Sequence, residues 1–145
     1  MAGQEATFFE ALRTALLAVE ISAGVKAFPR AWVQPYLDLE ALMKEPRWPT
    51  CVLIDNGWKI DRSNGKVKRG AFSVVIVLAK PRDPVGDASV LSLMDYTDVT
   101  VTALEYSTAN AIHAESAGGA DYTTLEGGVL LVARALEFTY ELRRA

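Results

Sequence analysis

The chain has 145 residues, of which 50% are hydrophobic, and its 15 basic and 18 acidic residues give a formal net charge of -3. This length suits one domain, residues 1–145, and the apolar content suffices for a core without disulfides or metals. The acidic balance argues against a globally basic nucleic-acid-binding protein, and no run of residues is long and apolar enough to cross a membrane.

The N-terminal segment predicts an amphipathic helix. In "ATFFEALRTALLAVEISAG", apolar residues such as Phe8, Leu12 and Leu16 recur at helical spacing. Gly24 is expected to end this helix, because glycine accepts the left-handed conformation found just past a helix end.

The next stretch, Val25–Pro49, is the least regular part of the chain. It contains four prolines, which exclude one continuous helix or strand. We expect a short strand near Val25–Phe28, then a loop, and a short helix near Leu37–Met43.

The strongest local pattern is a long β-hairpin that follows Pro49. Two β-rich runs flank Asn64-Gly65, the pair preferred in tight hairpin turns because both positions need a positive φ. The second run, "AFSVVIVLA", is apolar on both faces, which predicts a central strand covered on both sides. Gly57 is expected to mark a β-bulge in the first arm.

A second long helix is predicted from about Asp87. Its core-facing stripe is expected to contain Val90, Leu93, Met94, Thr97, Val101, Leu104 and Thr108. A second apolar stripe, roughly on the opposite side, contains Tyr96, Val99, Ala103 and Tyr106. Because a helix with two apolar sides is usually covered on both, the second stripe predicts contact either with a neighbouring subunit or with the proline-rich segment of the same chain.

The C-terminal part predicts two strands. "AIHAES" is expected to be a short strand, followed by a flexible glycine-rich loop and a long final strand from Leu130. The final strand is apolar on both faces at first and then only on the face of Leu136 and Leu142. Arg134 lies in its apolar row and needs a partner when buried, either inside the chain or across an interface.

Helices and strands do not alternate regularly along this chain. The sequence therefore predicts an α+β fold, with a mostly antiparallel sheet and a long β-hairpin packed against two main helices. The expected order is α-β-β-β-α-β-β.

Few residues suggest catalysis or metal binding. The single histidine, His113, lies between alanines in a predicted strand, and Asp95 and Asp98 fall where solvated charge is expected on a helix. Known nucleophile, phosphate-loop and zinc-protease motifs are absent from the sequence. The single cysteine, Cys51, is expected to be a buried small hydrophobe in a soluble protein made in a reducing cytoplasm.

The hairpin carries a cluster of positive charge. Its interface candidates are Trp58, Lys59, Arg62, Lys66, Lys68 and Arg69. These cations are compatible with simple solvation or protection against edge pairing, with an acidic protein partner, or with nucleic-acid phosphates.

The organisation as a whole is similar to that of one protein family. The resemblance rests on the helix "FFEALRTALLAV", the strand "PTCVLID", the charged hairpin leading into "FSVVIVLA", the long helix "DASVLSLMDYTDVTVTALE" and the closing "ARALEFTYELRR". It covers most of the chain, and it is one of architecture and pattern. On these segments the chain resembles the tail terminator proteins of long-tailed bacteriophages, also called tail completion or head–tail joining proteins.

The resemblance implies an α+β subunit of a homohexameric ring. Such a ring would cap the tail tube protein, stop its polymerisation and offer the docking surface for a head-completion or neck protein. DNA would pass through the ring without sequence-specific binding, and no enzymatic activity, cofactor or membrane contact is implied. The expected location is the head–tail junction of the virion, after synthesis in the host cytoplasm.

Within such a ring, the hairpin residues are expected to contact a neighbour or the tube. The residues expected at subunit contacts are Tyr96, Val99, Tyr106, Arg134 and Tyr140. The proline-rich stretch Val25–Pro49 and the glycine-rich "ESAGGADY" depart from the simplest family pattern, so the tube-facing and head-facing surfaces stay open.

Three other functions remain compatible with the sequence. One is a different connector ring, such as a head-completion or neck protein. Another is a small α+β ligand-binding or enzymatic domain, which would need a pocket with convergent polar groups. The last is a nucleic-acid-binding module that uses the basic hairpin.

Overall fold

A computed structural model describes residues 4–44, 48–60, 67–79, 87–105, 113–126 and 129–143 of the protein. The fold is α+β with mostly antiparallel strands, which confirms the predicted class. The elements in chain order are α1 (Gln4–Ala18), β1 (Glu20–Ser22), β2 (Val25–Lys26), β3 (Arg30–Gln34), α2 (Leu39–Lys44), β4 (Thr50–Ile60), β5 (Val67–Ala79), α3 (Asp87–Glu105), β6 (His113–Glu126) and β7 (Val129–Arg143).

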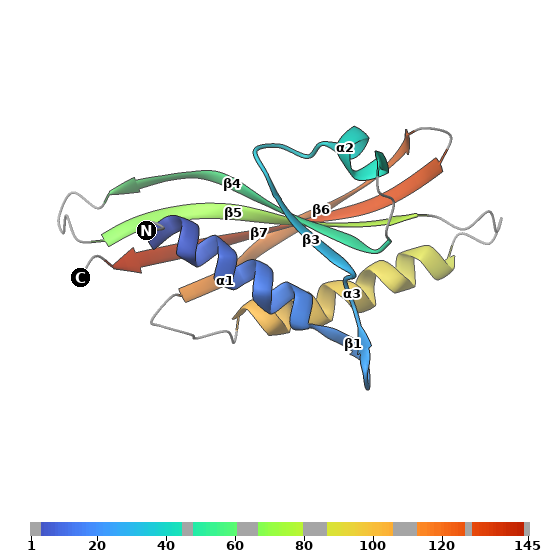
Figure 1. The fold of residues 1–145 in the computed structure, drawn as a ribbon, viewed down its shortest axis with the longest axis horizontal. Helices are drawn as coiled ribbons and strands as arrows, with labels where there is room; N and C mark the ends of the chain where they lie inside the picture. The colour runs from blue at the N-terminus through green and yellow to red at the C-terminus, as the bar shows by residue number, and fades with distance from the viewer. Residues whose placement is uncertain are drawn as a thin grey trace.

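Five strands form one twisted sheet in the order β3-β4-β5-β7-β6, and β1 and β2 form a separate small hairpin (Figure 1). The face that packs against α1 and α3 is called the helix face, and the opposite face, which α2 covers in part, is called the α2 face. Val74 and Ile76 of β5 lie in the core of the helix face, whereas Val75 and Val77 lie beneath Leu42 of α2. All four valine and isoleucine side chains are at most 3% exposed, so the prediction of a central strand covered on both sides is confirmed.

One pair of strands in this sheet is parallel. β3 pairs with β4 in register from Arg30 opposite Thr50 to Gln34 opposite Ile54. Parallel neighbours need a long crossover connection, and α2 lies in that connection. The crossover places Leu42 and Trp48 over the α2 face of the sheet, where they pack in one cluster with Trp32 of β3.

β7, with 15 residues, pairs with a strand on each of its two sides. It pairs antiparallel with β5 from Leu131 to Arg143 and, on its other side, with β6 from Val129 to Glu141. In its second half, Phe138, Tyr140 and Leu142 are at most 2% exposed on the helix face, while Glu137 and Thr139 are exposed on the α2 face. The predicted change from a strand buried on both faces to one buried on a single face is therefore confirmed.

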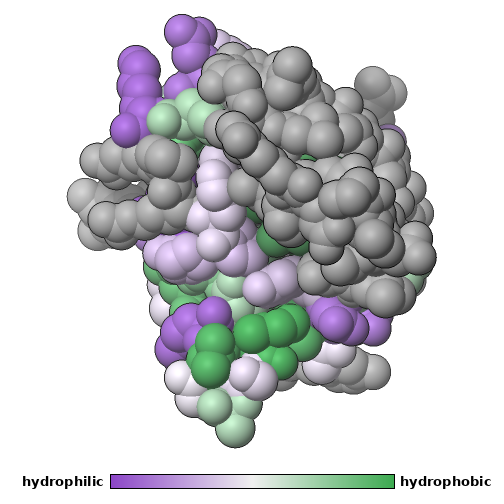
Figure 2. Space-filling model, turned by 90° about the vertical axis from the view of Figure 1, so that its right-hand side faces the viewer, coloured by the Kyte–Doolittle hydropathy of each residue, from purple (hydrophilic) through white to green (hydrophobic). Residues whose placement is uncertain are grey.

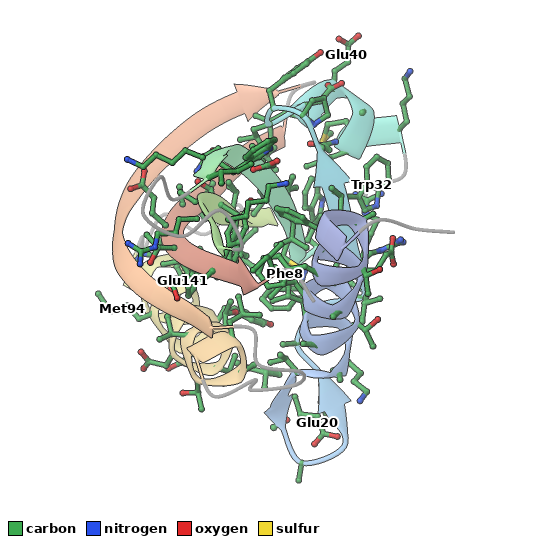
Figure 3. All side chains as sticks on the ribbon, turned by 90° about the vertical axis from the view of Figure 1, so that its left-hand side faces the viewer. Phe8, Glu20, Trp32, Glu40, Met94 and Glu141 are labelled. Atoms are coloured by element: carbon green, nitrogen blue, oxygen red, sulfur yellow. The ribbon has the colours of Figure 1, made fainter. Side chains whose placement is uncertain are left out.

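Aromatic rings pack between the start of α1 and the helix face of the sheet. Phe8 packs on Tyr140 with ring centroids 4.8 Å apart, and Phe72 stacks on Phe138 at 5.1 Å. Figure 3, which looks at the molecule from this end, shows Phe8 directed from α1 into the body of the protein. These contacts fix α1 across β5 and β7.

Two expectations about the N-terminal third are corrected. The first helix ends at Ala18, before Gly24, and Gly24 instead adopts φ +76° in the turn between β1 and β2. β-Pairing of Glu20 with Lys26 replaces the last predicted helical turn. The proline-rich stretch also contains a five-residue sheet strand, β3, where a loop was expected.

Two further expectations are corrected in the C-terminal half. Met94, assigned to the core stripe of the second helix, is 44% exposed and points outward in Figure 3, whereas the polar Thr100 is fully buried. The glycine-rich segment expected to be a loop lies within β6, a single strand of 14 residues with a register irregularity between Ser116 and Gly118. A local irregularity lets the strand keep pairing with β7 across its glycines.

Candidate interaction surfaces

The first candidate surface is the end of the β4–β5 hairpin. The pairing of the two strands shifts between Asp55 and Trp58, and Gly57 there has φ +105°, so the predicted bulge is confirmed. Asp55 Oδ1 accepts a hydrogen bond from the Gly57 N–H at 3.0 Å. Beyond the bulge, Trp58 lies in register with Gly70, which in turn pairs with Tyr140, so the indole projects on the helix face of the sheet.

An exposed aromatic and cationic patch results at this end. Trp58 is 49% exposed, and Ile60, two residues further on the same face, is 38% exposed. Lys68 Nζ lies 3.8 Å from the centroid of the Trp58 ring, a cation–π contact. The patch formed by Trp58, Ile60 and Lys68, together with neighbouring Lys59 and Arg69, is called the hairpin patch.

Two cations of the hairpin patch, Lys59 and Arg69, project on the α2 face, opposite to Trp58, Ile60 and Lys68. Lys59 and Arg69 are directly opposite each other in the β4–β5 ladder. Arg69 Nε lies 2.9 Å from Glu141 Oε1 on β7, and both side chains are more than a third exposed. Arg62 and Lys66, the other predicted hairpin cations, lie outside the described residues.

The second candidate surface is a groove between the β1–β2 hairpin and α3. It has a volume of about 370 Å³ and is lined by Val19, Glu20, Asp98, Val99, Thr102 and Ala103. Its floor is apolar, whereas Glu20 and Asp98 are exposed at its rim. Figure 2 shows hydrophobic surface at the lower end of the molecule, where the β1–β2 hairpin lies, with hydrophilic residues beside it.

The groove contains part of the second apolar stripe predicted on α3. Val99 and Ala103 line it, and Tyr96 packs instead on Phe28 of the proline-rich segment, with ring centroids 5.7 Å apart. Burial, with a smaller contribution from Asp95, raises the pKa of the Tyr96 hydroxyl above its ordinary value. For Tyr96, the structure therefore favours the contact within the chain. Tyr106 lies outside the described residues.

Two other predicted interface residues lie inside the chain. Arg134 Nη1 donates a hydrogen bond to Thr97 Oγ1 of α3 at 3.3 Å, so this guanidinium binds within its own subunit. Tyr140 is 2% exposed and packs among Phe8, Phe9 and Phe72. The expectation of a surface contact through Tyr140 is corrected, because α1 covers the ring completely.

The candidate chemical groups are spread over separate parts of the fold. His113 begins β6, where the structure describes its backbone pairing opposite Glu141, and Asp95 and Asp98 are exposed on α3. Cys51 is fully buried in β4, and burial raises the pKa of its thiol to about 12. Within the described ranges, no group of histidine, cysteine and carboxylate side chains is arranged to hold a metal ion.

Sequence reasoning missed the partners of the hairpin cations. Glu141 follows the polar alternation of β7, but its pairing with Arg69 depends on the register between β5 and β7. The groove was also missed, because Val19 and Val99 are distant in sequence and meet only through packing of α3 beside β1.

A scan against protein-family models finds no match for this chain, and a search of curated proteins finds no similar sequence. In the part of the chain that the structure describes, no helix combines the length and apolarity needed to span a bilayer.

Proposed function

We propose that this protein is a tail terminator of a long-tailed bacteriophage, acting as one subunit of a ring at the head–tail junction. The observation that carries the proposal is the hairpin patch, an exposed Trp58 with Ile60 and Lys68 at the free end of the long β4–β5 hairpin. Tryptophan is enriched among residues that contribute most to protein interfaces. Trp58, which is half exposed on a β-hairpin rich in lysine and arginine, is therefore well suited to bind another protein.

The fold agrees with what the resemblance implies. The structure has the α+β architecture, the long charged hairpin that continues into a central strand, and the two long helices on one sheet face, and it adds two short strands and α2 to the expected order. The mechanism in this proposal is geometric. A ring of subunits covers the growing end of the tail tube, prevents addition of further tube protein and presents its other side to a head-completion or neck protein.

The proposal is tested by negative-stain electron microscopy of the purified protein mixed with tail tubes of the same phage. We expect a cap at one end of each tube, and tubes assembled in the presence of the protein should stop at a uniform length. Uncapped tubes of uncontrolled length would contradict the proposal. Particles produced without the protein give a second readout: overlong tubes support a terminator, whereas normal tubes with leaking heads point to another connector ring.

A matched pair of variants tests the part played by the hairpin patch. Lys59→Glu with Lys68→Glu should leave the melting temperature within about 2 °C of the wild type, because both side chains lie outside the core. The same variant should lose capping. The control is Lys44→Glu, an exposed lysine on α2, which should cap normally. Equal capping by both variants would remove the hairpin patch from the proposal.

A further inference from the structure

We infer that the hairpin patch of one copy of this chain docks in the groove between β1 and α3 of a second copy. The inference rests on the self-assembly part of the proposed function and specifies the contact that builds the assembly. It depends on four observations: the positions of the two surfaces, the apolar fit, the opposite charges and the exposure of Trp58.

The two surfaces lie on different parts of the molecule. In Figure 1 the end of the β4–β5 hairpin is at the far left, whereas β1 and the adjoining part of α3 are at the bottom, nearer the middle. A hairpin therefore cannot reach the groove of its own chain. Contact between unlike surfaces is heterologous, and repetition of such a contact produces a closed ring when the rotation permits and a filament when it does not.

The apolar parts of the two surfaces match in kind and size. The hairpin patch offers Trp58 and Ile60, and the floor of the groove is formed by Val19, Val99 and Ala103. A volume of about 370 Å³ is near the lower limit for small-molecule sites, roughly 300–1,000 Å³, and suits one large side chain. The polar groups Glu20 and Asp98 stand at the rim, where they face an incoming surface.

The charges of the two surfaces are opposite. Residues 58–69 include five basic residues and one acidic residue, whereas α3 has four acidic residues and no basic one. At the groove, Asp98 is exposed, and the exposed Glu20 carboxylate has a long pairing with Lys26 at 3.9 Å and accepts a hydrogen bond from the Gly24 N–H at 3.3 Å. Exposed ion pairs of this kind contribute little, so Glu20 can exchange Lys26 for another cation while it keeps the bond from Gly24. Lys68, which lies on the same face as Trp58, would then approach Glu20 and Asp98 beside a buried Trp58, and Lys59 on the opposite face adds positive charge to the incoming hairpin end.

Positive and negative charges lie on different surfaces of the chain, which allows copies of a chain with a net negative charge to associate. Two copies with a uniform negative surface would repel, but a cationic end aimed at an anionic groove attracts and orients the partner. The association should therefore weaken as salt concentration rises, because the charges at the rim are screened. The same arrangement disfavours pairing of two hairpin ends or of two grooves.

The test uses two charge-reversed proteins that complement each other. The hairpin variant is Lys59→Glu with Lys68→Glu, and the groove variant is Glu20→Lys with Asp98→Lys. Each alone presents like charges at both surfaces, and we expect self-association at least about tenfold weaker than in the wild type by sedimentation velocity. An equimolar mixture restores opposite charges at every contact in an alternating assembly and should recover association.

The matched control reverses charges away from both surfaces. Glu40→Lys with Lys44→Glu changes two exposed residues of α2, and Glu40 points away from the body in Figure 3. This variant should associate like the wild type. Trp58→Ala should weaken association at least about 30-fold, the effect of losing an interface anchor.

Cysteine cross-linking provides a second measurement that does not depend on charge. A mixture of Ile60→Cys and Thr102→Cys proteins should form a disulfide-linked pair under mild oxidation, identified by mass spectrometry of the joined peptides. The native Cys51 is buried and does not interfere. Met94→Cys, exposed on α3 outside the groove, replaces Thr102→Cys as the control and should not form the pair.

The outcomes separate this inference from the proposed function. A wild-type chain that stays monomeric at millimolar concentration and low salt overturns the inference, as does a mixture of reversed variants that fails to recover association. Tube capping by a protein whose copies do not join through these surfaces would support the terminator function and refute the contact. Recovery of association without tube capping would support the contact and refute the terminator function.

Discussion

The ring of Tyr140 on β7 lies directly against the backbone of Gly70 on β5. The two residues are opposite each other in the ladder, and a Cβ atom at position 70 would be 2.5 Å from both Cζ and Oη of the tyrosine. Glycine at this position therefore provides the space in which Tyr140 packs against Phe8 and Phe72. The contact connects the strand that carries the hairpin patch to the aromatic core under α1.

Gly70→Ala should destabilise the protein by about 2–3 kcal/mol, because the added methyl group displaces a fully packed ring. Urea unfolding followed by circular dichroism measures the change. Tyr140→Leu supplies the control in a double-mutant cycle: the double variant should lose clearly less stability than the sum of the two single variants. Additive losses would show that the two side chains do not share this space.

Thr97→Val should cost about 1–2 kcal/mol of unfolding free energy, because it removes the hydroxyl that accepts a hydrogen bond from Arg134. Thr100→Val is the matched control. Both threonines donate to the carbonyl four residues earlier, at 2.6 Å for Thr97 and 2.7 Å for Thr100, so both variants lose this bond and only Thr97→Val also loses the arginine contact. Equal effects of the two substitutions would argue against a contribution from Arg134.

Arg30→Lys should destabilise the fold by about 2–3 kcal/mol. Arg30 is 7% exposed, its Nη2 donates to the Leu42 carbonyl at 3.1 Å and to Thr50 Oγ1 at 3.4 Å, and its guanidinium lies 4.5 Å from the Trp32 ring centroid. A lysine ammonium reproduces neither the fork nor the stacking. Urea unfolding measures the change. The control is Arg69→Lys, at an exposed ion pair, which should change the free energy of unfolding by less than about 0.5 kcal/mol.

Stability should fall steeply above pH 9 because of Cys51. Its pKa is about 12 in the folded protein and near the ordinary value of 9.0 when unfolded. Below pH 9 both states hold the proton and the contribution is fully present. Between pH 9 and 12 only the unfolded chain releases it, so stability is lost with rising pH.

The measurement compares urea unfolding at pH 8 and pH 10.5. The wild type should lose about 2 kcal/mol more between these values than Cys51→Ala, which lacks the thiol, at roughly 1.4 kcal/mol per pH unit. Lysines and tyrosines titrate in both proteins, so their contributions cancel when the stability loss of Cys51→Ala is subtracted from that of the wild type. Parallel losses would mean that the Cys51 thiol ionises equally in the folded and unfolded states.

Sequence patterns predicted the strands whose burial depends on their own residues. The run around Val74 and Ile76 is apolar on both faces and lies at the centre of the sheet, and Gly57 marks a bulge because few other residues accept its positive φ. The change along β7 from two buried faces to one followed from the alternation of Glu137 and Thr139 with aromatic residues. Each of these features depends on residues within one short segment, so it can be predicted from the sequence of that segment.

The elements that sequence patterns missed depend on distant partners. β3 carries Arg30 and Gln34, which resemble loop residues until the Leu42 carbonyl of α2 binds Arg30 and the backbone of Asp38, just before α2, binds Gln34. β6 contains consecutive glycines that give no alternating pattern, and its pairing with β7 defines it as a strand. For the candidate surfaces, the cations of the hairpin were readable from sequence, whereas the groove required the packing of α3 beside β1.

The position of β7 also limits how the protein can fold. β5 and β6 are not neighbours in the sheet, and each obtains its shared partner only when β7 inserts between them. The β5–β7 ladder joins residues separated by all of α3 and β6, so loop closure opposes it until late, and folding on the slow scale of milliseconds to seconds is expected for such non-local pairing. Until β7 inserts, two long strand edges stay open to other chains, which makes the nascent protein vulnerable to aggregation.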